Sequence, residues 1–134
     1  MATKKKIFCE WIEKADEDFN FASLNLSDPS NPFYAQICYH LQQAAEKYLK
    51  AYIVAYKLKF KKIHDLLELL RICMEREPSF SSLSQECEFL TDYYIDTRYP
   101  VHWPTNVNRK EAKEAKSSAE KIGTFVKNLL GVSI

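Results

Sequence analysis

The chain has 134 residues, a length that fits one domain over residues 1–134 with a single hydrophobic core. Its 19 Lys and Arg residues against 18 Asp and Glu give a net charge of +1, which argues against a protein that coats nucleic acid through a broad basic surface. With 46% hydrophobic residues and 2 glycines, the composition favours helices joined by short connections, because sheets with tight turns need more glycine. The predicted class is all-α.

The cysteines and the apolar runs exclude several classes of protein. Cys9, Cys38, Cys73 and Cys87 are widely spaced and form no CxxC or Cys/His cluster, which indicates reduced core thiols rather than a zinc site or a disulfide framework. No metal or cofactor is predicted, since no carboxylate pair has metal-binding spacing and no glycine-rich phosphate loop occurs. No apolar run is long enough to span a membrane or resembles a signal peptide, so a cytoplasmic protein without membrane contact is expected.

Two long helices are predicted in the first half of the chain. Apolar residues recur every three or four positions over residues 8–26, which predicts the first. Asn31 before Pro32 predicts an N-cap with proline at the first helical position, so the second helix is predicted over residues 32–57. Its apolar face opposes a polar ridge that is either solvated or covered by another subunit. The polar ridge consists of Gln36, His40, Gln43, Lys47, Lys50 and Lys57.

A third helix is predicted over residues 64–77, after the basic connection KLKFKKIH. His64 is interpreted as a helix-start residue beside Asp65. Pro78 and the serine cluster that follows it end this helix.

A fourth helix is predicted over residues 82–98, opened by a capping box of Ser82 and Gln85. It ends near Arg98, because Pro100 cannot donate a backbone hydrogen bond and biases the residue before it away from the helical region. The last helix is predicted over residues 109–130.

That last helix has a clear signal at each end. Asn108 followed by Glu111 is a capping-box pattern, and Gly131 is a natural C-terminal stop. Its alanine-rich stripe predicts the core-facing side, and Lys127 is among the residues predicted to face outward.

The candidate site lies in the segment YYIDTRYPVHWP, residues 93–104. Arg98 is placed at the predicted helix C-terminus, where the backbone dipole favours a cation, and His102 follows in the loop, so both could point into one cleft. The alternative is that Arg98 pairs with Asp92 or Asp96 and that His102 is a solvated loop residue.

Three segments carry a resemblance to a known family: YHLQQAAEKYLKAYIVAYK at residues 39–57, HDLLELL at 64–70 and YYIDTRYP at 93–100. Together they resemble the RYP-type branch of the HEPN family, a helical domain named for higher eukaryotes, prokaryotes and nucleotide binding. The resemblance covers almost the whole chain. It implies an up-and-down bundle of four to five helices, like nucleotidyltransferase substrate-binding subunits, and a homodimer with the functional residues in the cleft between subunits.

The resemblance also implies a chemistry. Many family members are metal-independent ribonucleases that use an arginine followed, after four to six residues, by a histidine. Arg98 matches that arginine, but three residues separate it from His102, which departs from the catalytic spacing. Cleavage of RNA without a metal needs proton transfer, which a histidine provides, and a cation on the phosphate, which an arginine provides. Some members are toxins paired with a small nucleotidyltransferase.

The predicted function is binding of a nucleotide or RNA phosphate in a homodimer cleft, beside a minimal nucleotidyltransferase partner in a toxin-antitoxin-like system. Arginine would clamp the phosphate, lysines would add positive charge and aromatic rings would stack on a base. Two alternatives stay open: a metal-independent endoribonuclease in which Arg98 and His102 are catalytic, and a non-catalytic dimeric adaptor. The predicted ligand-binding residues are Arg98, Tyr99, Lys47, Lys50, His40 and Trp103.

Overall fold

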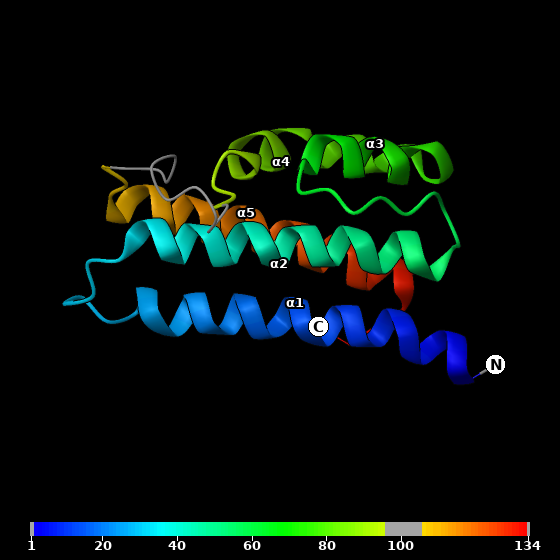
Figure 1. Ribbon diagram of the computed structural model, residues 1–134, viewed down its shortest axis with the longest axis horizontal. Coiled ribbons are helices and arrows are strands. Elements are labelled where there is room, and N and C mark those ends of the chain that lie inside the picture. The colour runs from blue at the N-terminus through cyan, green and yellow to red at the C-terminus, as the bar shows by residue number, and fades with distance from the viewer. Residues whose placement is uncertain (1, 96–105, 134) are drawn as a thin grey trace.

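The computed structural model describes residues 2–95 and 106–133, and all regular secondary structure within these ranges is helical. The elements, shown in Figure 1, are α1 (Ala2–Leu26), α2 (Tyr34–Ala55), α3 (Leu66–Arg76), the 3₁₀-helix η1 (Pro78–Leu83), α4 (Ser84–Thr91) and α5 (Arg109–Leu130). The predicted all-α bundle is confirmed.

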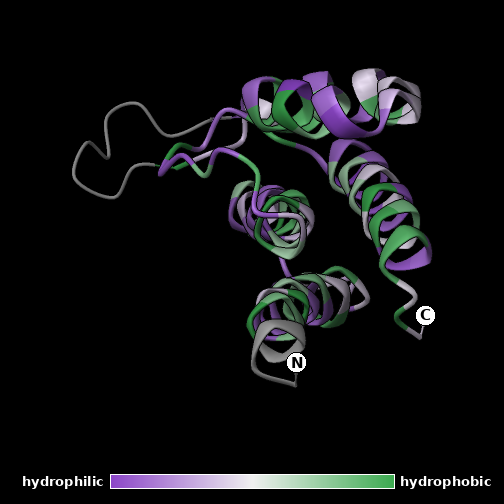
Figure 2. Cartoon of the chain, turned by 90° about the vertical axis from the view of Figure 1, so that its right-hand side faces the viewer, coloured by the Kyte–Doolittle hydropathy of each residue, from purple (hydrophilic) through white to green (hydrophobic). Residues whose placement is uncertain are grey.

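Helix α2 is the central element of the bundle. It packs against α1, α3, α4 and α5, and seen along the long axis it lies between α1 and the layer of α3 and α4 (Figure 2). A helix covered on several sides buries polar positions together with apolar ones, and Gln42, Glu46 and Lys50 are all buried on α2. These side chains must therefore find their hydrogen-bond partners inside the protein.

The predicted start of the second helix is wrong by two residues. Helix α2 begins at Tyr34 with Phe33 at the N-cap position, and Pro32 lies outside it. Asn31 is not available as a cap, because its Oδ1 accepts a hydrogen bond from the Phe33 amide at 2.9 Å and its Nδ2 donates to Asn25 Oδ1 at 2.9 Å. The Asn31 side chain closes the turn between α1 and α2 instead of opening the helix.

The starts of the first and third helices also differ from prediction. Helix α1 begins at Ala2 rather than at residue 8. Helix α3 begins at Leu66 because Asp65 is its N-cap, accepting hydrogen bonds from the amides of Leu67 and Glu68. His64 therefore lies just before the helix rather than in its first turn.

The predicted fourth helix starts later and in a different way. Pro78 opens the 3₁₀-helix η1, in which Ser82 lies, and α4 begins at Ser84. Leu83 at the N-cap position makes no side-chain cap hydrogen bond, so the predicted capping box of Ser82 and Gln85 is wrong. A short 3₁₀ turn at a helix N-terminus satisfies backbone groups without such a cap.

Helix α4 also ends earlier than predicted, at Thr91 rather than near Arg98. The Tyr93 amide donates to the Leu90 carbonyl at 3.0 Å, a turn that replaces the helical pattern. The Thr91 Oγ1 accepts from the Leu66 amide at 3.0 Å and so joins the end of α4 to the start of α3.

Both predicted ends of α5 are confirmed. The Asn108 side chain accepts from the Glu111 amide at 2.8 Å, and the Glu111 carboxylate accepts from the Asn108 amide, which completes the capping box. Gly131 follows the helix with φ 69°, the left-handed conformation that favours glycine at a C-terminal stop.

Candidate functional site

The predicted site residues divide into two groups. His40, Lys47 and Lys50 lie on α2 and are described. The predicted catalytic pair and the two aromatic residues beside it lie outside the described residues, between Ile95 and Asn106. These are Arg98, Tyr99, His102 and Trp103.

A series of aromatic and imidazole rings runs from α1 across α2 to Tyr94, which follows α4, and to His64, which precedes α3. Phe21 and His40 have ring centroids 4.5 Å apart, His40 and Tyr39 are 5.3 Å apart, and Tyr39 and Tyr94 are 6.1 Å apart. Tyr94 then stacks on His64 with centroids 3.9 Å apart and planes inclined by 13°. We define Phe21, His40, Tyr39, Tyr94 and His64 as the ring row. One of its members, Tyr94, precedes Arg98 by four positions in the sequence.

Asp18 of α1 binds two of the predicted site residues. Its Oδ1 lies 3.0 Å from His40 Nδ1, and its Oδ2 accepts from Lys47 Nζ at 2.5 Å. Burial raises the pKa of the Asp18 carboxyl, but these two hydrogen bonds outweigh burial and hold the pKa below its usual value. The positive charge of Lys47 is therefore directed to a carboxylate of the same chain.

Glu46 is the centre of a second, more deeply buried group. It is 4% exposed, and its Oε2 accepts from Lys50 Nζ at 2.8 Å. Its Oε1 lies 2.9 Å from His64 Nδ1 and accepts from Gln43 Nε2 at 3.3 Å. Because the Lys50 side chain is only 7% exposed, contact between Lys50 and a phosphate would require breaking a buried ion pair.

His64 makes more contacts than its place beside Asp65 in the sequence indicates. Its carbonyl oxygen accepts from Gln42 Nε2 at 3.0 Å, its ring nitrogen is bound to Glu46, and its ring stacks on Tyr94. A local sequence signal exists only for Asp65, the cap. Gln42 and Glu46, the two hydrogen-bond partners of His64, lie on α2. No rule of sequence spacing relates these two residues to His64.

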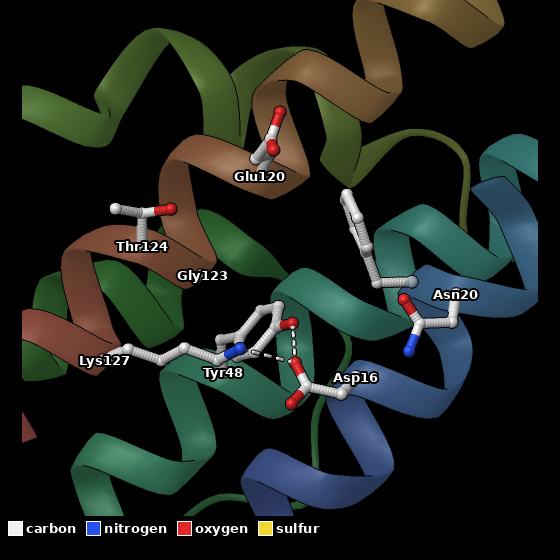
Figure 3. Close-up of a pocket in the computed structure, with 8 residues that line it drawn as sticks. Asp16, Asn20, Tyr48, Glu120, Gly123, Thr124 and Lys127 are labelled. Atoms are coloured by element: carbon white, nitrogen blue, oxygen red, sulfur yellow. Dashed lines mark hydrogen bonds and ion pairs between the residues drawn. The ribbon is translucent and has the colours of Figure 1, made fainter. Parts of the chain in front are cut away.

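A separate cavity of about 220 Å³ lies between α1, α2 and α5 (Figure 3). Within it Tyr48 donates a hydrogen bond to Asp16, and Lys127 Nζ lies 2.9 Å from the same Asp16 oxygen. Lys127 was predicted to face outward, but its side chain is 14% exposed and reaches across to α1. The three polar groups satisfy one another's hydrogen-bonding capacity. This cluster therefore has the features of a structural contact that joins α1, α2 and α5.

The described part of the chain holds no cluster of three or more His, Cys, Asp or Glu residues that could bind a metal ion. Within the same ranges, no helix combines the length and the apolar character needed to cross a lipid bilayer.

Comparison with known proteins identifies the family. The model of the HEPN domain matches residues 8–129. The chain belongs to the HEPN family. The resemblance drawn from the three sequence segments is thereby confirmed. No curated protein sequence matches this HEPN chain significantly.

Two solved structures are similar to this HEPN protein. The crystal structure of TT1696 from Thermus thermophilus has a TM-score of 0.77 at 32% identity, covering 90% of this chain and 96% of that one. ST0689, described as an archaeal HEPN homologue, has a TM-score of 0.72 at 24% identity, covering 92% of this chain and 97% of that one. The second likeness concerns the fold alone.

One carboxylate of this HEPN protein joins the two sides of segment 96–105. Tyr93, just before the segment, donates from its hydroxyl to Glu111 Oε2 at 2.6 Å. Asn108, just after it, donates from its amide to Glu111 Oε1 at 3.4 Å. Burial and the bond to Glu111 raise the pKa of the Tyr93 hydroxyl, so it stays a donor across the physiological range. The residues on both sides of the segment that carries Arg98 and His102 are therefore held by the same carboxylate.

Proposed function

We propose that this HEPN protein binds a nucleotide or an RNA phosphate in the cleft of a homodimer, with Arg98 as the phosphate clamp. The observation that supports this most is the ring row, which includes Tyr94. Arg98 is four positions further along the chain, so the two Cα atoms are at most about 15 Å apart whatever the path between them. A phosphate on Arg98 is thus within reach of the stacked rings.

The chemistry of the ring row fits such a ligand. Every base has a π-face that stacks on aromatic side chains, and stacking tolerates different sequences. Tyr99 and Trp103 are proposed to add to this stacking, and His40 to line the same face. Because Lys47 and Lys50 are each paired with a carboxylate, the phosphate is proposed to bind the Arg98 guanidinium, which matches phosphate geometry through paired donors.

We also propose a partner protein. Membership of the HEPN family supports a pairing with a minimal nucleotidyltransferase in a toxin-antitoxin-like system, acting in the cytoplasm. A reading frame for such an enzyme beside the gene for this chain would support the pairing.

The direct test is binding by the purified protein after its oligomeric state has been measured by light scattering. The probes are adenosine monophosphate and a short fluorescein-labelled RNA of mixed sequence. We expect the wild-type dimer to bind at least one probe and Arg98→Ala to lose most of that affinity, since a charge-assisted bond to phosphate contributes about 1.5–3 kcal/mol. A folded Arg98→Ala dimer with unchanged affinity for both probes would refute the proposal.

A specific observation keeps the endoribonuclease as a second candidate. The two described histidines, His40 and His64, are each held at Nδ1 by a carboxylate, an arrangement that orients an imidazole for proton transfer. Incubation with a mixed RNA pool in EDTA tests it. Cleavage that Arg98→Ala and His102→Ala both lose would establish a metal-independent ribonuclease. A folded dimer that neither cleaves nor binds RNA would point to the adaptor.

A further inference from the structure

We propose that His64 is a further ligand-contacting residue of this site, which hydrogen-bonds a phosphate oxygen of the nucleotide or RNA through its Nε2. This inference rests on the proposed function and adds to it a residue from the connection before α3. The sequence motif HDLLELL places His64 there, and the structure gives its ring a defined orientation.

The orientation follows from Glu46. Glu46 Oε2 accepts from Lys50 Nζ at 2.8 Å, and Oε1 lies 2.9 Å from His64 Nδ1; because a carboxylate oxygen accepts, the hydrogen of this contact is assigned to His64 Nδ1. Nε2 is then an acceptor lone pair in the neutral ring and a second N–H donor in the charged ring, and only the charged ring donates to a phosphate oxygen. Among the described residues, none is hydrogen-bonded to Nε2, and the His64 side chain is 45% exposed. Within residues 2–95 and 106–133, the outer nitrogen is therefore left for a ligand.

The ring is also held in place before any ligand arrives. Tyr94 stacks flat against one face at 3.9 Å, and Gln42 binds the His64 carbonyl oxygen. The next two residues are fixed as well, Asp65 as the cap of α3 and Leu66 through its bond to Thr91. Binding to such a group loses little side-chain entropy, which is the advantage of a preorganised contact.

The position of His64 suits a phosphate next to a stacked base. Tyr94 lies 3.9 Å from His64 and 6.1 Å from Tyr39 between ring centroids, so a base on the ring row would bring its phosphate near the exposed edge of His64.

A purely structural role makes a different prediction. If His64 only joins α2 to α3, its contribution lies in Nδ1 and in the stack on Tyr94, and its loss changes stability without changing affinity. The variant His64→Phe separates the two roles, because it keeps a flat ring for Tyr94 and removes both nitrogens. Tyr56→Phe, at the end of α2, is the matched control, since it also keeps a ring and removes one polar atom, at an exposed position outside the ring row.

The first measurement is affinity for adenosine monophosphate and for the labelled RNA, with the melting temperature of each variant recorded. We expect His64→Phe to bind the RNA about tenfold more weakly than wild type, the loss of one hydrogen bond to a charged group, and Tyr56→Phe to bind it normally. A loss with RNA but not with the mononucleotide would assign the contact to a backbone phosphate of RNA.

The second measurement uses the wild-type protein and does not depend on any variant folding. Long-range nitrogen NMR of the three histidines should show the His64 Nε2 resonance moving as RNA is added while Nδ1 stays near its starting value. An unmoved Nε2 at saturating RNA, or normal affinity in folded His64→Phe, would overturn the role of His64. If the role of His64 is overturned in this way but Arg98→Ala still loses binding, the proposed function stands and only the role of His64 fails. If the wild-type dimer binds neither probe, both fail.

Discussion

Gly123 on α5 and Tyr48 on α2 meet with no space for an added atom. A Cβ on Gly123 would lie 2.7 Å from Tyr48 Cε2 and 2.9 Å from Cζ, closer than real Cβ contacts. The Tyr48 ring cannot turn away freely, because its hydroxyl is bonded to Asp16 and Lys127 Nζ lies 5.7 Å from the ring centroid. Glycine at this position lets α5 approach α2 closely enough for all three polar groups to meet.

The variant Gly123→Ala tests this contact. In an exposed helix interior the change would raise the free energy of unfolding by about 1 kcal/mol. Here we expect it to lower that free energy by about 1–3 kcal/mol, because the added methyl group overpacks a fixed ring. Urea denaturation gives the value, with the exposed α5 variant Ser117→Ala as control. A midpoint above that of wild type would show that the ring moves aside at little cost.

A contrasting effect is expected at the other glycine. Nothing lies within 4 Å of a Cβ on Gly131, but its φ of +69° is a conformation that side chains disfavour. Gly131→Ala should therefore lower the free energy of unfolding by about 1 kcal/mol through the backbone alone. Gly131→Asn should cost less, since asparagine tolerates this region. Equal stability of the alanine variant and wild type in urea would mean that the end of α5 rearranges.

Acid should destabilise the contact between α1 and α2 through Asp18. Its pKa is below the usual value in the folded protein, so the unfolded state binds more protons, and the stability from Asp18 is lost as pH falls through the folded pKa. Asp18→Asn should be less stable at neutral pH, by about 1–3 kcal/mol, and should lose less on acidification. Urea unfolding at neutral and acidic pH measures this, with Glu10→Gln as an exposed α1 control. Parallel pH profiles for wild type and Asp18→Asn would contradict the assignment.

The buried pair of Glu46 and Lys50 should show strong coupling. Lys50→Met or Glu46→Gln alone leaves one buried charge with fewer partners and should cost about 3 kcal/mol or more. The double variant should cost less than the sum of the two, because neither charge then remains. A double-mutant cycle in urea measures the coupling. Additive losses would mean that Lys50 and Glu46 are solvated independently in solution.

Thiol chemistry should distinguish one cysteine from the other three. Burial raises the pKa of Cys38, Cys73 and Cys87 to about 12 each, so these side chains remain protonated and shielded at neutral pH. Cys9 on α1 is only partly buried. Mass spectrometry after iodoacetamide treatment should find native protein labelled at Cys9 alone and unfolded protein labelled at all four. Rapid native labelling of Cys73 would indicate local opening of α3.

The ends of α5 could be predicted from sequence because their signals are local. Asn108 and Glu111 lie three residues apart and satisfy each other, and Gly131 needs no distant partner. The N-terminus of α2 could not be predicted in the same way, since the Asn31 Oδ1 accepts from the Phe33 amide in the turn while its Nδ2 is held by Asn25 of α1. When a residue fits two structural roles, the packing around it decides which role it takes. A local sequence pattern carries no information about that packing.

The candidate site shows the same limit. The periodicity of α2 predicted a polar ridge that is solvated or covered by another subunit, but Lys50 of this ridge is buried on Glu46, Lys47 is bound by Asp18 of α1, and Lys57 lies beyond the end of α2. Amphipathic spacing separates two faces of a helix, and α2 is covered on more sides than two. His64 and Glu46 meet across 18 residues of sequence, a distance that only the packing of α3 on α2 defines.

The carboxylate of Glu111 gives this fold a practical property. Because Tyr93 and Asn108 are both bonded to it, the stretch between them is joined to the bundle at two points that it does not itself supply. We expect stretches of other lengths, placed between the same two anchors, to leave the two bonds to Glu111 in place. The number of residues between Arg98 and His102 would then be a variable that chimeras change one residue at a time.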